Sequence, residues 1–173
     1  MDGKQTIKCV VVGDAAVGKT SLIVSYTTGS FPNCYAPTIW DSYDSEAVAG
    51  ASVKLSIFDT AGEEEYDRIR PRSYPNTHVF ILCYAINNPS SYLNVLQKWL
   101  PEVQHHCPTA NIMVVGTKKD LRENGDDNIT KTTTLKEQNN DGCLSLECSA
   151  LTSQGLNELF EKVIELAAQV KLQ

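Results

Sequence analysis

Residues 13–20 combine residue types that suit phosphate binding. They read G-x-x-x-x-G-K-T and follow an apolar run at residues 7–12. In a loop of this kind between a strand and a helix, successive backbone N–H groups converge on an anion, and the helix N-terminus adds its dipole. Lys19 is expected to reach the β- and γ-phosphates, and the Thr20 hydroxyl to ligate Mg²⁺. The alternative, a chance glycine turn, is disfavoured because a predicted strand precedes these residues and a predicted helix follows them.

A second short stretch, Asp59-Thr60-Ala61-Gly62, lies at the end of another apolar strand. A lone Asp at a strand end is most often a turn former. Beside a phosphate loop, however, Asp59 has the position of the acid that holds Mg²⁺. Gly62 would let the backbone approach the γ-phosphate closely, because glycine has no side chain.

A third stretch, Thr117-Lys118-Lys119-Asp120, is expected to select the base. A carboxylate accepts two parallel N–H bonds, and guanine offers such a pair on its N1 and 2-amino edge, whereas adenine does not. Leaving a buried acceptor unpaired costs about 1–3 kcal/mol. The stem of Lys118 would lie over the ring. In isolation Lys-x-Asp is a common surface tripeptide, but a buried strand precedes this one.

The elements that must position these motifs can be read from hydrophobic periodicity. Six strands are predicted, at residues 7–12, 41–48, 52–58, 78–85, 112–115 and 143–147. Helices are predicted at residues 18–28, from residue 88 with a kink at Pro101, at 131–139 and from 156 to 167. Residues 27–40 are expected to form a long loop, and long loops in compact domains tend to be functional.

Strands that alternate with helices, plus one hairpin, predict an α/β domain of three layers. We expect a six-stranded, mostly parallel sheet with one antiparallel edge strand and about five helices. Ligands of such sheets bind at the carboxyl ends of the strands. The three motifs all fall at such ends, and so does Cys148-Ser149-Ala150-Leu151. Their convergence predicts one site.

Composition narrows the functional class. The 173 residues suit one domain, residues 1–173, with 42% hydrophobic and 21% charged residues. A net charge of −6 without a basic stripe argues against a nucleic-acid partner. Residues 79–86, the longest apolar stretch, are too few to span a bilayer. Six cysteines without a C-x-x-C pair favour reduced core thiols and a cytoplasmic protein.

Taken together, the motifs resemble those of small GTPases of the Ras superfamily, with a P-loop GTPase fold. Within it, four segments resemble the Rho/Rac/Cdc42 family: residues 35–41 (YAPTIWD), 66–71 (YDRIRP), 73–75 (SYP) and 105–108 (HHCP). The two histidines in the last segment could suggest a metal site. With three histidines in the chain and no ligand spacing, a solvated helix end is favoured.

The resemblance implies further site residues. Thr38 would bind Mg²⁺ with Thr20 and Asp59 and sense the γ-phosphate; Phe31 would flank the guanine, and the backbone of Ala150 would meet its carbonyl oxygen. The residues expected to take part in hydrolysis are Lys19, Thr38, Gly62 and Glu63. Those expected to contact GDP or GTP are Gly13, Asp14, Ala15, Ala16, Val17, Gly18, Lys19, Thr20, Ser21, Phe31, Tyr35, Thr38, Gly62, Thr117, Lys118, Asp120, Leu121, Ser149, Ala150 and Leu151.

The chain departs from the Rho pattern at four places. Ala15 stands where that family usually has glycine, and Glu63 where it usually has the glutamine that positions the attacking water. Between Asp120 and Cys148 there is no room for the extra helix of Rho proteins. The last residues contain neither a polybasic stretch nor a prenylation box, so a peripheral plasma-membrane location is expected only if a lipidated tail is missing.

The resulting expectation is a monomeric guanine-nucleotide switch with GTPase activity and impaired turnover. Exchange factors, activating proteins, dissociation inhibitors and effectors would bind residues 31–43 and 62–75. One alternative is a hydrolysis-impaired GTP-binding protein regulated by exchange, abundance or localisation. A metabolic P-loop kinase is disfavoured, since no second substrate-binding domain or lid is apparent.

Overall fold

The computed structural model describes all residues except 1–3, 34–39, 50, 140 and 171–173. Six strands form one sheet in the order β2-β3-β1-β4-β5-β6. Their bounds are β1 Gln5–Gly13, β2 Trp40–Ala49, β3 Ala51–Thr60, β4 Val79–Ala85, β5 Asn111–Thr117 and β6 Leu144–Glu147. Every neighbouring pair is parallel except the β2–β3 edge hairpin. The predicted fold class is therefore confirmed.

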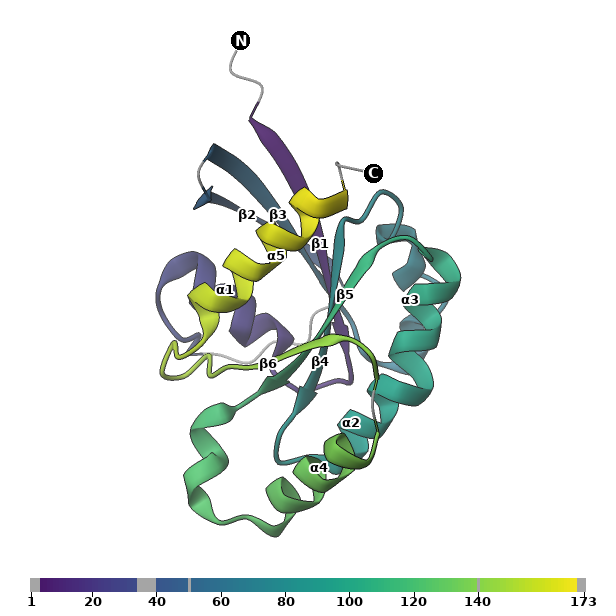
Figure 1. The fold of residues 1–173 in the computed structure, drawn as a ribbon, viewed down its shortest axis with the longest axis vertical. Coiled ribbons are helices and arrows are strands. Elements are labelled where there is room, and N and C mark those ends of the chain that lie inside the picture. Colours follow the sequence, from purple (N-terminus) through teal and green to yellow (C-terminus); the bar gives the residue numbers. More distant parts are fainter. Residues whose placement is uncertain (1–3, 34–39, 50, 140, 171–173) are drawn as a thin grey trace.

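Helices cover both faces of the sheet (Figure 1). On one face lie α1 (Lys19–Thr28) and α5 (Leu156–Val170); on the other lie α2 (Pro89–Asn94), α3 (Leu100–His106) and α4 (Asp127–Gln138). Two clusters of buried side chains separate the three layers, and β4 is buried along its whole length. That burial explains why β4 reads as an unbroken apolar run.

The helix between β4 and β5 contains a π turn. Residues Val95–Trp99 join α2 to α3, and the Leu100 N–H donates to the Val95 carbonyl five residues earlier. The turn ends two residues before Pro101, which has no N–H to donate to a ladder of i→i−4 bonds. The sequence predicted a kink at Pro101, and the structure has a π turn just before this residue.

Two other boundaries differ from the prediction. Helix α4 begins at Asp127 rather than residue 131, because the Asp126 side chain caps it by accepting from the Asn128 N–H. The segment after β3 was expected only to be charged; it contains two 3₁₀ turns, Glu64–Tyr66 and Arg70–Ser73. A further 3₁₀ turn, Lys119–Asn124, follows β5, and the described residues from there to β6 contain α4 and no Rho-type extra helix.

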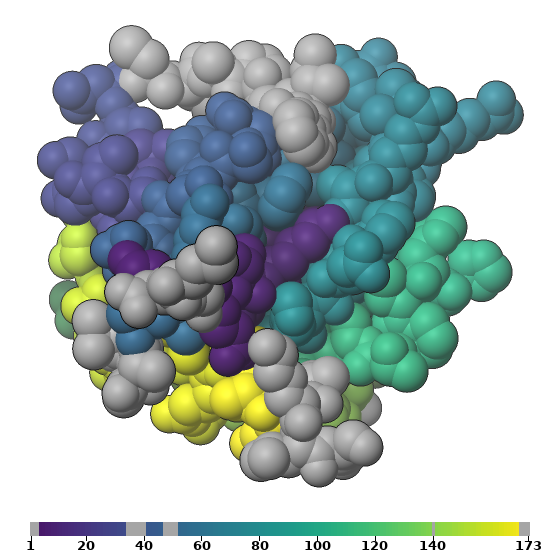
Figure 2. Space-filling model, turned by 90° about the horizontal axis from the view of Figure 1, so that it is seen from above, coloured from purple at the N-terminus to yellow at the C-terminus, as the bar shows by residue number. Residues whose placement is uncertain are grey.

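The two ends of the sheet differ in what they present. Viewed from above, β1, the β2–β3 hairpin and the last turns of α5 lie next to one another (Figure 2). The parallel strands run away from this face, so their carboxyl ends and the loops with the motifs lie at the opposite end (Figure 1). None of the described helices is long and apolar enough to cross a membrane.

Candidate nucleotide and magnesium site

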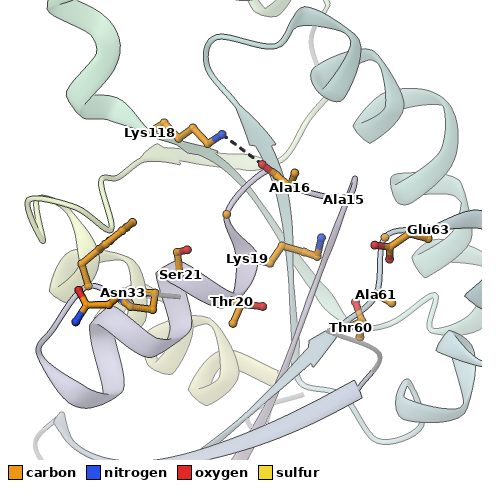
Figure 3. A pocket seen from close by; sticks show the side chains of 14 residues that line it. Ala15, Ala16, Lys19, Thr20, Ser21, Asn33, Thr60, Ala61, Glu63 and Lys118 are labelled. Atoms are coloured by element: carbon orange, nitrogen blue, oxygen red, sulfur yellow. Dashed lines mark hydrogen bonds between the residues drawn. The ribbon is translucent and has the colours of Figure 1, made fainter. Parts of the chain in front are cut away.

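The phosphate loop joins β1 to α1 in a conformation that favours glycine. Gly18 caps α1 in the left-handed region at φ 96°, and a Cβ on Gly13 would come within 2.5 Å of the Cys83 carbonyl oxygen. Ala16 also lies in the left-handed region, at φ 64°. The loop turns around a cavity of about 480 Å³ (Figure 3). The residues that line it are Ala15, Ala16, Gly18, Lys19, Thr20, Ser21, Phe31, Pro32, Asn33, Thr60, Ala61, Gly62, Glu63 and Lys118.

Lys19 is the buried cation of this cavity. Its ammonium donates to the carbonyl oxygens of Gly13 (3.0 Å) and Asp14 (2.7 Å). Burial lowers the pKa of Lys19, while carboxylates including Asp59 and Glu63 act to raise it. Figure 3 shows Glu63 on the side of the cavity toward which Lys19 points. An anion bound here would stabilise the charged form of Lys19.

Thr20 and Asp59 bring two oxygen ligands together beside Lys19. The Thr20 hydroxyl donates to the Asp59 carboxylate, which is fully buried at the end of β3. A hydroxyl and a carboxylate suit Mg²⁺, which binds few protein oxygens and keeps water and phosphate oxygens as its other ligands. No cluster of three His, Cys, Asp or Glu side chains occurs among the described residues. Thr38 and Tyr35 lie outside the described residues.

Gly62 lies against the phosphate loop. A Cβ on Gly62 would come within 2.4 Å of both the Ala15 nitrogen and the Gly13 oxygen. Contacts this short do not occur, so only glycine permits the observed approach. The sequence predicted that Gly62 lets the backbone approach the γ-phosphate closely. In the structure, the Gly62 backbone lies close to the phosphate loop, which would hold that phosphate.

A second cavity, of about 220 Å³, adjoins the first and shares Gly18, Ser21, Phe31 and Lys118 with it. Its other lining residues are Leu22, Thr117, Asp120, Leu121, Cys148, Ala150 and Leu151. The predicted phosphate-binding groups thus lie in one cavity and the predicted base-binding groups in the next. Adjoining cavities of this kind suit a nucleotide.

Hydrogen bonds hold the predicted base-binding residues in place. Ser149 donates from its hydroxyl to Asp120 Oδ1 at 2.7 Å, and Lys118 donates to the Ala16 carbonyl at 3.3 Å. The Thr117 hydroxyl donates to the carbonyl oxygens of Val17 and Tyr84. These bonds tie the phosphate loop at Val17 and the end of β4 at Tyr84 to Thr117, the last residue of β5.

Most of the described residues predicted for the site line one of the two cavities. Five lie behind the walls and contact residues that line them: Gly13, Asp14, Val17, Asp59 and Ser149. The sequence did not predict the side chains that hold Asp14, which are Asn94 and Trp99, or the buried Arg70. No local motif marks these contacts, because they join segments far apart in the chain.

Comparison with known families agrees with this geometry. Residues 8–169 match the Ras family, so the match spans the phosphate loop, the base-binding segment and the whole sheet beyond the first residues of β1. The chain therefore belongs to the Ras family, whose members are GTPases that bind GTP and GDP.

Proposed function

We propose that this Ras-family chain is a Rho-type guanine-nucleotide switch. The observation that carries the proposal is the pair of adjoining cavities: Lys19 and Thr20 face the first, and Asp120, oriented by Ser149, faces the second. A carboxylate held by a hydroxyl on one oxygen can accept the paired N–H groups of guanine. The GDP and GTP states would differ in residues 27–40 and 62–74.

The described side chains suit GTP hydrolysis in different roles. Lys19 would bind the β- and γ-phosphates, which replace its present carbonyl partners. Thr20 and Asp59 would hold Mg²⁺, which neutralises charge that develops on the phosphate oxygens. Gly62, next to the phosphate loop, can present its backbone N–H to the γ-phosphate.

As a second candidate function we propose a GTP-binding protein that hydrolyses GTP slowly, and two residues favour it. Glu63 lines the phosphate cavity, and a carboxylate only accepts hydrogen bonds, whereas a glutamine amide also donates one toward the phosphate. The methyl group of exposed Ala15 lies at the cavity rim, where an activating protein would insert its arginine. Such an arginine accelerates hydrolysis about 10³–10⁵-fold. A chain that excludes it would be regulated by exchange, abundance or localisation.

The Rho assignment and the partners rest on the sequence segments 35–41, 66–71, 73–75 and 105–108. We propose that exchange factors, activating proteins, dissociation inhibitors and effectors bind residues 31–43 and 62–75, and that the protein acts as a monomer in cytoskeleton-type signalling. We also propose a cytoplasmic location, with peripheral membrane binding only through a lipidated tail.

The test is to identify the nucleotide that copurifies with the protein and to follow it over hours. Denaturation and ion-exchange chromatography should release GDP or GTP and no adenine nucleotide. After loading with GTP, a cycling switch would convert it to GDP within the experiment. A hydrolysis-impaired protein would retain GTP. Copurification of adenine nucleotides alone would contradict the proposed function.

A further inference from the structure

We propose that Arg70 is a positioning residue for γ-phosphate recognition, because it holds the backbone on both sides of Gly62 and connects it through Trp99 to the phosphate loop. This inference rests on the proposed function. The Arg70 guanidinium is buried; its Nε donates to the Ala61 carbonyl at 2.7 Å and its Nη2 to the Glu63 carbonyl at 3.1 Å. A planar guanidinium can make both bonds at once.

Two acids compensate the buried charge of Arg70. Its Nη1 donates to Asp67 at 2.7 Å and to Glu102 at 3.1 Å, and Glu102 also accepts from the Tyr74 hydroxyl. Partial burial opposes ionisation of Asp67, but hydrogen bonds and charges from Arg70 and Lys98 outweigh it and lower the pKa of this carboxyl. The guanidinium is thus paired on its far edge while its near edge holds residues 61–63.

Trp99 connects this cluster to the phosphate loop. The Arg70 Cζ lies 4.6 Å from the centre of the Trp99 ring, in cation–π contact, and Trp99 Nε1 donates to Asp14 Oδ1 at 2.8 Å. Asn94 Nδ2 donates to the other oxygen, Asp14 Oδ2, at 2.7 Å. Both carboxylate oxygens of a phosphate-loop residue are therefore held by the same helix.

The π turn makes this double contact possible. Asn94 and Trp99 are five residues apart, and in an α-helix the neighbours that share a face are three or four residues apart, not five. The wider turn at Val95–Trp99 brings both side chains to one carboxylate. Single π turns occur often at functional sites. The Arg70–Trp99–Asp14 chain therefore joins the Gly62 segment to the phosphate loop against which it packs.

The consequence is specific to the third phosphate. GDP needs the phosphate loop, whereas a γ-phosphate also needs Gly62 at a fixed distance from that loop. Loss of the Arg70 bonds should therefore weaken binding of a GTP analogue more than binding of GDP. A role in folding alone would lower thermal stability and leave the ratio of the two affinities unchanged.

The experiment measures dissociation constants of GDP and a non-hydrolysable GTP analogue, with Mg²⁺, for four proteins. Arg70→Lys keeps the charge but cannot make both carbonyl bonds, and Trp99→Phe keeps the ring but loses the donor to Asp14. Arg122→Lys, in the exposed ion pair with Glu147, is the matched control for the unaltered chain.

We expect both test variants to lose at least about tenfold in affinity for the GTP analogue, with GDP affinity unchanged within about twofold because Asn94 still holds Asp14 of the phosphate loop. The control should match the unaltered chain. If Arg70→Lys does not fold, Trp99→Phe decides. Equal losses for both nucleotides, or no loss for either, would overturn the inference and leave the proposed function intact. An unaltered chain that binds neither nucleotide would refute the proposed function itself, and this inference with it.

Discussion

Replacing Gly62 by alanine tests the close packing between β3 and the phosphate loop. Gly62 does not occupy the left-handed region, so an alanine can adopt its backbone conformation, and the cost comes from contact alone. The new methyl group would lie 2.4 Å from two backbone atoms and 2.6 Å from a third, in a loop whose carbonyl groups also bind Lys19. Backbone atoms held in this way cannot move aside cheaply.

Forcing a methyl group into a well-packed site costs about 1–3 kcal/mol. For a domain of this length that cost should lower Tm by about 2–12 °C. Where a ligand needs the packed arrangement, the same free energy corresponds to an affinity loss of about 5–150-fold. We expect that loss for a GTP analogue and a much smaller one for GDP.

The assay for Gly62→Ala combines thermal unfolding at saturating GDP with titration of both nucleotides. Gly125→Ala is the control: its site is in the left-handed region at φ 64°, but no atom lies within 4 Å of the new methyl group. The control should lose stability through backbone strain without changing the ratio of the two affinities. If the Tm of Gly62→Ala lies within about 1 °C of the Tm of the unaltered chain, the reasoning from packing is refuted.

Three further predictions follow from single residues. Ala15→Gly with Glu63→Gln should restore strong stimulation of single-turnover GTP hydrolysis by a Rho-type activating protein; equal stimulation of the unaltered chain would show that turnover is not impaired. Burial raises the pKa of the Cys148 thiol to about 12. As the pH rises, this thiol therefore loses its proton in the unfolded chain before it does so in the folded chain. The free energy of unfolding should then fall by up to about 1.4 kcal/mol per pH unit between about pH 9 and 12. Denaturant titrations at several pH values should show a shallower fall of the unfolding free energy with pH for Cys148→Ala than for the unaltered chain. Parallel curves of unfolding free energy against pH would exclude Cys148 as the cause. Exposed Arg72 lies in the proposed partner surface, so Arg72→Leu should tighten binding of Rho-type effector domains; an unchanged Kd would place Arg72 outside the interface.

The sequence predicted the parts of the fold and site that depend on local pattern. The phosphate loop, Asp59 and Asp120 could be placed because each follows an apolar strand, and parallel strands bring their carboxyl ends to one edge. The start of α4 was misplaced because this helix buries only two of its residues, Ile129 and Thr132, so its apolar periodicity is weak.

What could not be predicted depends on contacts between distant segments. Arg70 lies among exposed charged residues in the sequence, and nothing local distinguishes it from Arg68 or Arg72. Its burial results from carbonyl groups at residues 61 and 63 and from Trp99 and Glu102, which only the folded chain brings together. The π turn is equally invisible to a periodicity of 3.6 residues, because it interrupts that periodicity for one turn.

The central claim is that the adjoining cavities bind a guanine nucleotide through Asp120. Competition of GDP and ADP against a fluorescent guanine nucleotide, on the unaltered chain and on Asp120→Ala, tests it most directly. We predict that GDP displaces the probe from the unaltered chain at least about a hundredfold more effectively than ADP, since two hydrogen bonds to a charged acceptor contribute about 3 kcal/mol or more. Asp120→Ala should lose that preference. Equal displacement by ADP and GDP from the unaltered chain would contradict the claim.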